Sequence, residues 1–268
     1  MKAKKKLTGK QKKMAVIGGT VGAVVIIIGI ILIVWAAQSP SAYRQLQRAR
    51  NKNEALGGYQ ASIQATYRAT YNGVEDTMNM TGLMYTKKKP EKNMLVLQSD
   101  AQFGSHSDDN YSLATSLFSS GEKVYEKDGV TAKESDITLD EFKKACRQNK
   151  LIDFGRRDIA SVQEFDGNEA GGNTCLVFQL SRVSNDILES HAKQYETMIP
   201  GEKEIDTSDI TLTLAQATYI IKDGDILSQN LQISTSYEKD GLSMSYSSLT
   251  DVGFVDISED FDFELPAV

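Results

Sequence analysis

The chain has 268 residues and a formal net charge of −6. Residues 1–13 hold seven lysines and no acid, so the rest of the chain carries about −13, the difference between −6 and +7. This acidic remainder repels polyanions, which excludes nucleic acid as a partner, and the two histidines exclude a histidine-rich metal site.

Residues 14–37 form an uncharged, strongly apolar segment. As a helix rising about 1.5 Å per residue, it would be ~36 Å long, enough to cross a ~30 Å hydrocarbon core. The lysines before it predict a cytoplasmic N-terminus, and Trp35 lies where an indole favours the membrane interface. A cleaved signal peptide is the alternative, but its apolar region is typically ~7–15 residues long, and Trp35 and Pro40 spoil the two candidate cleavage sites. We therefore expect a basic cytoplasmic tail at 1–13, an uncleaved transmembrane helix at 14–37, and an extracytoplasmic remainder at the plasma membrane.

Residues 38–58 are predicted to form a helical stalk. Ser39 and Pro40 are typical of a helix start, with serine as the cap and proline in the first turn. Gly57 and Gly58 end the polar helical pattern that follows.

The domain predicted for residues 59–268 begins with alternating apolar and polar residues, the pattern of a half-buried strand. Asn72-Gly73 indicates a tight turn to a second alternating segment. The chain ends in a meander of strands over 210–249, where Asp223-Gly224 and Asp240-Gly241 are further turn signals.

Two helices are predicted between the groups of strands. The segment Thr138 to Glu141 matches a capping box and starts the first helix, and the second starts near Ser184. The second helix turns His191 and Tyr195 toward the core. About nine antiparallel strands with two inserted helices predict an α+β fold, in which a curved antiparallel sheet, or half-barrel, is covered by the helices.

The sequence contains no motif of a zinc protease, a serine hydrolase, a phosphate-binding loop or a dinucleotide-binding fold. His106 lies in a polar loop beside serines and aspartates, but a catalytic triad is assembled from distant segments. We therefore expect a non-enzymatic protein with no cofactor and no metal.

Cys146 and Cys175 are compatible with two states. In an oxidising exterior, a disulfide closing a loop of ~30 residues would contribute roughly 3–4 kcal/mol. Two separately buried free thiols are the alternative, and the sequence does not decide between them.

Methionines and tyrosines recur on the apolar side of the predicted strands. Methionine adapts to varied apolar ligands, although each of these side chains also suits ordinary core filling. The candidate cavity residues are Tyr67, Tyr71, Met78, Met80, Met84, Met94, Met244 and Tyr246.

This order of anchor, helix, long strands, two helices and closing meander, together with the hairpin segment Tyr219 to Asp225, resembles the LolA/LolB-like lipoprotein-carrier superfamily. The likeness covers roughly residues 42–266, and it is greatest to divergent surface-attached members in Gram-positive bacteria. It implies that an apolar or lipid ligand binds between sheet and helices. The predicted transmembrane anchor departs from the family, whose members carry a lipid-modified cysteine or are free in the periplasm. Long-distance shuttling of a lipoprotein is therefore not expected here, because a tethered carrier acts only near its own membrane. We thus predict a membrane-tethered extracytoplasmic binding protein; the alternative is an assembly subunit of a bacterial cell-envelope complex, without a small-molecule ligand but with a protein partner.

Overall fold

The computed structural model describes residues 41–104, 110–128, 131–146, 152–165, 172–199, 204–239, 241–257 and 261–266. The tail and the transmembrane segment that we expected, residues 1–13 and 14–37, lie outside this part. Within the described ranges, no helix is both long enough and apolar enough to cross a bilayer.

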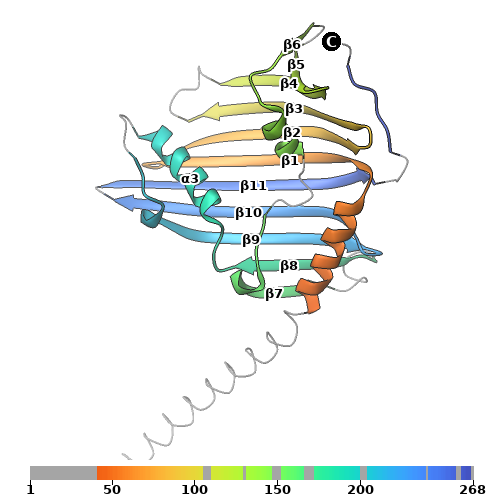
Figure 1. Ribbon diagram of the computed structural model, residues 1–268. Helices are drawn as coiled ribbons and strands as arrows, with labels where there is room; N and C mark the ends of the chain where they lie inside the picture. Colours follow the sequence, from red (N-terminus) through yellow and green to blue (C-terminus); the bar gives the residue numbers. More distant parts are fainter. Residues whose placement is uncertain are drawn as a thin grey trace, which may run out of the picture.

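One open antiparallel sheet of eleven strands dominates the described part of the chain (Figure 1). The strands are β1 (Gly58–Tyr71), β2 (Val74–Lys88), β3 (Glu91–Phe103), β4 (Tyr111–Ser120), β5 (Lys123–Asp128), β6 (Thr131–Glu134), β7 (Ile159–Phe165), β8 (Thr174–Leu180), β9 (Ile210–Lys222), β10 (Asp225–Lys239) and β11 (Leu242–Asp256). The helices are α2 (Leu139–Cys146), α3 (Asn185–Met198) and a helix over residues 41–55.

The predicted α+β class is wrong, because the chain is mainly β. The strands extend farther than the sequence pattern indicated, with β2, β10 and β11 reaching 15 residues each. The helices add little, since α2 has only 8 residues. The estimate of about nine strands also falls short, partly because β6 is a four-residue edge strand without apolar alternation.

The sheet consists of two meanders that meet in the middle. From β1 the chain runs outward strand by strand to β6 at one edge, crosses to β7 at the other edge, and returns inward to β11. The two meanders join where β1 pairs with β11. Two of the predicted turns are confirmed by positive φ angles at both central residues, 48° and 85° at Asn72-Gly73 and 51° and 85° at Asp223-Gly224.

All three helices lie on one face of the sheet, here called the inner face (Figure 1). Each covers its own apolar cluster: the helix over residues 41–55 buries Leu46, α2 buries Phe142 and α3 buries Tyr195. In the middle of the sheet, the outer face carries short polar side chains, among them Ser62, Thr66, Ser234 and Ser245. Near β4 this face also buries Phe118. The three large apolar clusters lie on the inner face, which therefore holds most of the core.

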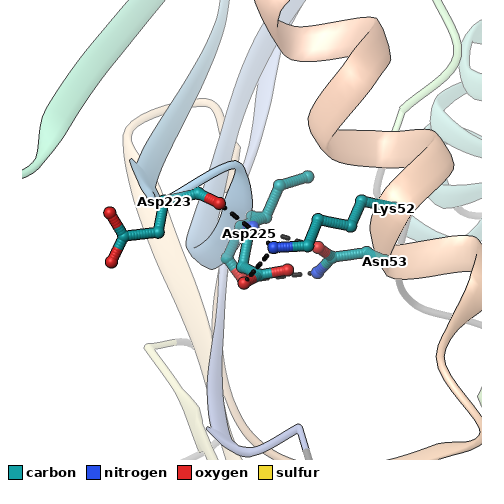
Figure 2. A network of polar contacts seen from close by, with 5 residues as sticks. Lys52, Asn53, Asp223 and Asp225 are labelled. Atoms are coloured by element: carbon teal, nitrogen blue, oxygen red, sulfur yellow. Dashed lines mark hydrogen bonds and ion pairs between the residues drawn. The ribbon is translucent and has the colours of Figure 1, made fainter.

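The helix over residues 41–55 belongs to the core rather than standing apart from it, since Leu46 and Ala49 are fully buried. Figure 2 shows the contacts between the C-terminal end of this helix and the β9–β10 hairpin. Lys52 Nζ donates to Asp223 O at 3.1 Å and to the Asp225 carboxylate at 2.7 Å. Asn53 accepts from Ile226 N at 3.0 Å and donates to Ile226 O at 3.3 Å, so one amide satisfies both backbone groups.

Both cysteines are free thiols in this structure. Cys146, the last residue of α2, is buried in the cluster with Tyr59 and Met84, and this burial raises the pKa of its thiol to about 12. Cys175 pairs with Ile220 on β9, whereas its neighbour Leu176 points into the core. The two thiols therefore lie on opposite faces of the sheet and several strands apart, which separates them far beyond disulfide geometry.

Candidate functional site

A cavity of about 490 Å³ lies on the inner face, between the C-terminal half of α3 and the strand ends near the β1–β2 turn. Most of its lining is aromatic or aliphatic. The lining residues are Tyr67, Ala69, Tyr71, Val74, Asp76, Thr77, Met78, Ala101, Phe103, Tyr111, Gln194, Thr197, Met198 and Tyr246.

The register of the sheet brings these side chains together. Tyr67 on β1 is opposite Met78 on β2, which is in turn opposite Ala101 on β3. Ala69 lies between Asp76 on one side and Tyr246 of β11 on the other. Because side chains two residues apart share a face, these neighbours form one continuous floor across four strands.

The roof of the cavity is α3, which is held by two buried side chains in its middle. His191 Nδ1 and Tyr195 Oη each share a hydrogen bond with Thr235 Oγ1 on β10, at 2.9 and 2.8 Å. The His191 ring also packs edge-on against Tyr246, with centroids 4.7 Å apart. These contacts fix the helix over the sheet, so Gln194, Thr197 and Met198 in its last turns face the cavity.

Ionised groups are scarce among the described residues that line the cavity. Burial raises the pKa of Tyr67 and raises that of Tyr246 to about 12, so both phenols stay protonated at physiological pH. Asp76 is the one charged residue among the described lining residues. Its Oδ1 accepts a hydrogen bond from Gly104 N at 2.9 Å, which orients the carboxylate.

The rim of the cavity exposes apolar side chains to solvent. Val74 and Tyr111 are 43% and 48% exposed, although both line the cavity. Leu113, two residues along β4 and on the same face as Tyr111, is 57% exposed. A cluster of exposed apolar side chains is typical of a surface that contacts a membrane or an apolar partner.

The structure distributes the eight cavity residues proposed from the sequence over three places. Tyr67, Tyr71, Met78 and Tyr246 line the cavity, and Met244 is buried beside it in the cluster under α3. Met80 and Met84 pack in the cluster under α2. Met94 lies on the outer face, where it pairs with Phe118. A contact between any of them and a ligand stays a prediction.

Sequence reasoning missed Phe103, Tyr111 and Asp76 as lining residues. Phe103 ends β3 and Tyr111 begins β4, on either side of a loop, and their ring centroids lie 6.3 Å apart. The alternation of Ala101 and Phe103 could have placed Phe103 on the inner face. Asp76 lies two residues before Met78, so the same alternation could have placed it on the inner face.

Protonation of His191 should weaken the attachment of the α3 roof in acid. Burial lowers its pKa to about 4, and its contacts Thr235 and Tyr246 are uncharged. The unfolded chain regains the ordinary value of about 6.5 and therefore binds more protons than the folded chain below that pH. This part of the stability is complete above about pH 6.5 and is lost as the pH falls toward 4, by about 2 kcal/mol.

Urea unfolding at about pH 7 and about pH 4.5 measures this effect. The free energy of unfolding of the wild type should fall by about 2 kcal/mol more than that of His191→Gln, which has no imidazole to protonate. Other titrating groups cancel in this difference. Equal losses in the two proteins would contradict the prediction.

Comparison with known proteins finds only weak structural similarity. No family model and no curated protein matches the chain. Among solved structures, the chain is similar to one of lipid–protein interactions in lipovitellin, at 9% identity and a TM-score of 0.38, covering 79% of this chain but 26% of that one. It thus spans about a quarter of the lipovitellin chain.

Two further solved structures are similar over most of their length. One is a DUF1329 family protein from Desulfovibrio piger, at 9% identity and a TM-score of 0.20, covering 86% of this chain and 95% of that one. The other is a β-barrel-like DUF1849 protein from Brucella abortus, at 11% identity and a TM-score of 0.18, covering 75% and 99%. At this coarse level, the similar proteins include a lipid-binding one and a barrel-like one, but such low scores assign no function to this chain.

Proposed function

We propose that this protein binds an apolar, lipid-like ligand in the cavity beneath α3, without catalysing a reaction on it. The observation that carries the proposal is the cavity itself: about 490 Å³ on the inner face of the sheet, with a lining that is mostly aromatic and aliphatic. Ligand sites are typically clefts of ~300–1,000 Å³, lined by apolar side chains with a few polar groups that fix orientation. The apolar rim formed by Val74, Tyr111 and Leu113 supports entry of such a ligand.

The chemistry of the lining supports binding rather than catalysis. The two buried phenols, Tyr67 and Tyr246, stay protonated and so are poor general bases at neutral pH. The remaining polar side chains of the lining, such as Gln194 and Thr197, can supply hydrogen bonds to a headgroup.

We also propose that the domain is held at the outer face of a plasma membrane. This part of the proposal rests on the sequence of residues 1–37 alone, with its lysine cluster and the long uncharged stretch that follows. Because the anchor would keep the cavity beside a bilayer, the local concentration of amphiphiles at its apolar rim would be high.

Photolabelling tests the proposed binding site. The full chain is placed in nanodiscs of zwitterionic phosphatidylcholine with a long-chain alcohol that carries a diazirine, and labelled peptides are mapped by mass spectrometry. We expect labelling of the peptides that contain Tyr71 and Met198. In Ala69→Trp the indole fills the cavity, and this labelling should fall at least about tenfold, which corresponds to a loss of about 1.4 kcal/mol.

The matched control is Ala114→Trp. Ala114 is exposed on β4 and lies outside the cavity lining, so the same substitution there should leave labelling at the cavity unchanged. Circular dichroism verifies that both variants keep their β-sheet. Equal labelling at the cavity in the wild type and Ala69→Trp would overturn the proposed site, and so would a wild type that the probe does not label there.

A further inference from the structure

We infer that the cavity selects an apolar ligand that carries a cationic ammonium group, which Asp76 and the surrounding aromatic rings recognise. The inference rests on the proposed binding of an apolar ligand and specifies the chemistry of its headgroup. It is carried by the aromatic lining, by the charge of the cavity and by the way the carboxylate is held.

Aromatic rings from four strands converge on the cavity. They are Tyr67 and Tyr71 from β1, Phe103 from β3, Tyr111 from β4 and Tyr246 from β11. The face of an aromatic ring carries partial negative charge and attracts cations, above all quaternary ammonium groups that are weakly hydrated. Five rings around one cavity therefore attract a cation more strongly than an aliphatic core of the same size would.

The charge of the cavity has the sign that complements a cation. Asp76 is the one charged group among the described lining residues, which include no lysine or arginine. An anionic headgroup, such as a carboxylate or a phosphate, would meet a like charge without a compensating base. An ammonium group would meet an opposite charge within a partly desolvated wall, where the attraction is stronger than in bulk water.

The carboxylate of Asp76 is held in place from the backbone. Gly104 N donates to Asp76 Oδ1 at 2.9 Å. A Cβ at Gly104 would lie 2.5 Å from Glu75 O, so this close approach of β3 to β2 requires glycine. The sheet thus presents an oriented negative charge between Ala69 and Phe103, its two neighbours across the strands.

Three probes with one alkyl chain and one diazirine test this inference. They end in trimethylammonium, hydroxyl or carboxylate, and each is added to the full chain in nanodiscs of a neutral glycolipid, which brings no ammonium group of its own. In the wild type, we expect the trimethylammonium probe to label the cavity peptides at least about fivefold more than the alcohol does, a ratio within the range of cation–π and ion-pair effects. The carboxylate probe should label them least.

Asp76→Asn removes the charge but keeps an oxygen that can accept from Gly104 N. In this variant, labelling by the trimethylammonium probe should fall to about the level of the alcohol, while labelling by the alcohol stays unchanged. Asp100→Asn is the matched control, since Asp100 lies on the same strand as Ala101 but on the outer face, and it changes the net charge equally. In this control, labelling of the cavity peptides by all three probes should stay unchanged. The comparison also corrects for the different partitioning of the probes into the bilayer.

The outcomes separate this inference from the proposed function. Equal labelling of the cavity by all three probes in the wild type would overturn the cation preference and leave apolar binding intact. A loss of all three probes in Asp76→Asn would show that Asp76 shapes the cavity rather than recognising charge, which also overturns the inference. If no probe labels the cavity in the wild type, the proposed binding function itself fails.

Discussion

Replacing Gly82 by alanine should lower the free energy of unfolding by about 3 kcal/mol or more. Gly82 lies in β2 between Ile63 of β1 and Leu97 of β3. A Cβ there would lie 2.3 Å from Val96 O and 2.7 Å from Leu97 Cδ2, well inside contact distance. Leu97 can rotate, but the Val96 carbonyl belongs to the backbone of β3, so the strands must separate to admit a methyl group.

Urea unfolding of the full chain, followed by the circular dichroism of the β-sheet, measures the loss. Gly155→Ala is the control, because the nearest atom to its added Cβ is Asp158 Oδ2 at 3.4 Å and its φ of −94° suits any residue. That variant should stay within about 0.5 kcal/mol of the wild type. Similar urea midpoints of unfolding for Gly82→Ala and the wild type would contradict this prediction. They would show that β2 and β3 can move apart here at little cost.

The second large effect is expected at Arg50, which is only 2% exposed. Its Nη2 donates to Ile152 O at 2.9 Å and to Tyr219 Oη at 2.7 Å, and the guanidinium lies over the rings of Phe154 and Tyr219 at 4.9 and 5.2 Å. Its Nε and Nη1 have no hydrogen-bond partner among the described residues. The side chain therefore fills the core well, but its buried charge is incompletely compensated.

Two variants should distinguish the contribution of side-chain volume at Arg50 from that of its buried charge to the free energy of unfolding. Arg50→Ala leaves a cavity and two unpaired acceptors, and it should cost about 3 kcal/mol. Arg50→Met leaves the same two acceptors unpaired, but it refills most of the volume and removes the buried charge, so it should cost only about 1–2 kcal/mol.

Urea unfolding compares these proteins, with Arg48→Ala, an exposed arginine on the same helix, as the control. The control should change stability by less than about 0.5 kcal/mol. If Arg50→Met is as unstable as Arg50→Ala, then the polar contacts of Arg50, rather than its volume, stabilise this part of the core.

Local features of the fold were predictable because short-range chemistry determines them. The capping box at the start of α2 is confirmed, since Glu141 N donates to Thr138 Oγ1 and Thr138 N donates to the Glu141 carboxylate. Ser184 precedes α3 as predicted, and His191 and Tyr195 are buried as its pattern indicated.

The arrangement of the strands could not be predicted in the same way. Nothing in the alternation of β1 shows that its second neighbour is β11, because any half-buried strand offers the same backbone groups. The faces of the methionines depend on register as well: Met94 alternates as Met78 and Met84 do, yet it lies on the outer face. The cavity combines residues of five strands with one helix, and only half of the proposed residues line it.

The pairing of β1 with β11 has a consequence for how the molecule is made. Ser62 Oγ donates to Gly253 O at 3.3 Å across this seam, although 191 residues separate the two in the chain. Contacts of such long range form slowly, because a large loop must close before they contribute. The first meander is therefore complete along the chain while β1 still exposes a free edge, and an exposed strand edge invites pairing with other chains. Until β11 pairs with β1, the floor of the cavity is incomplete and the free edge of β1 remains open to aggregation.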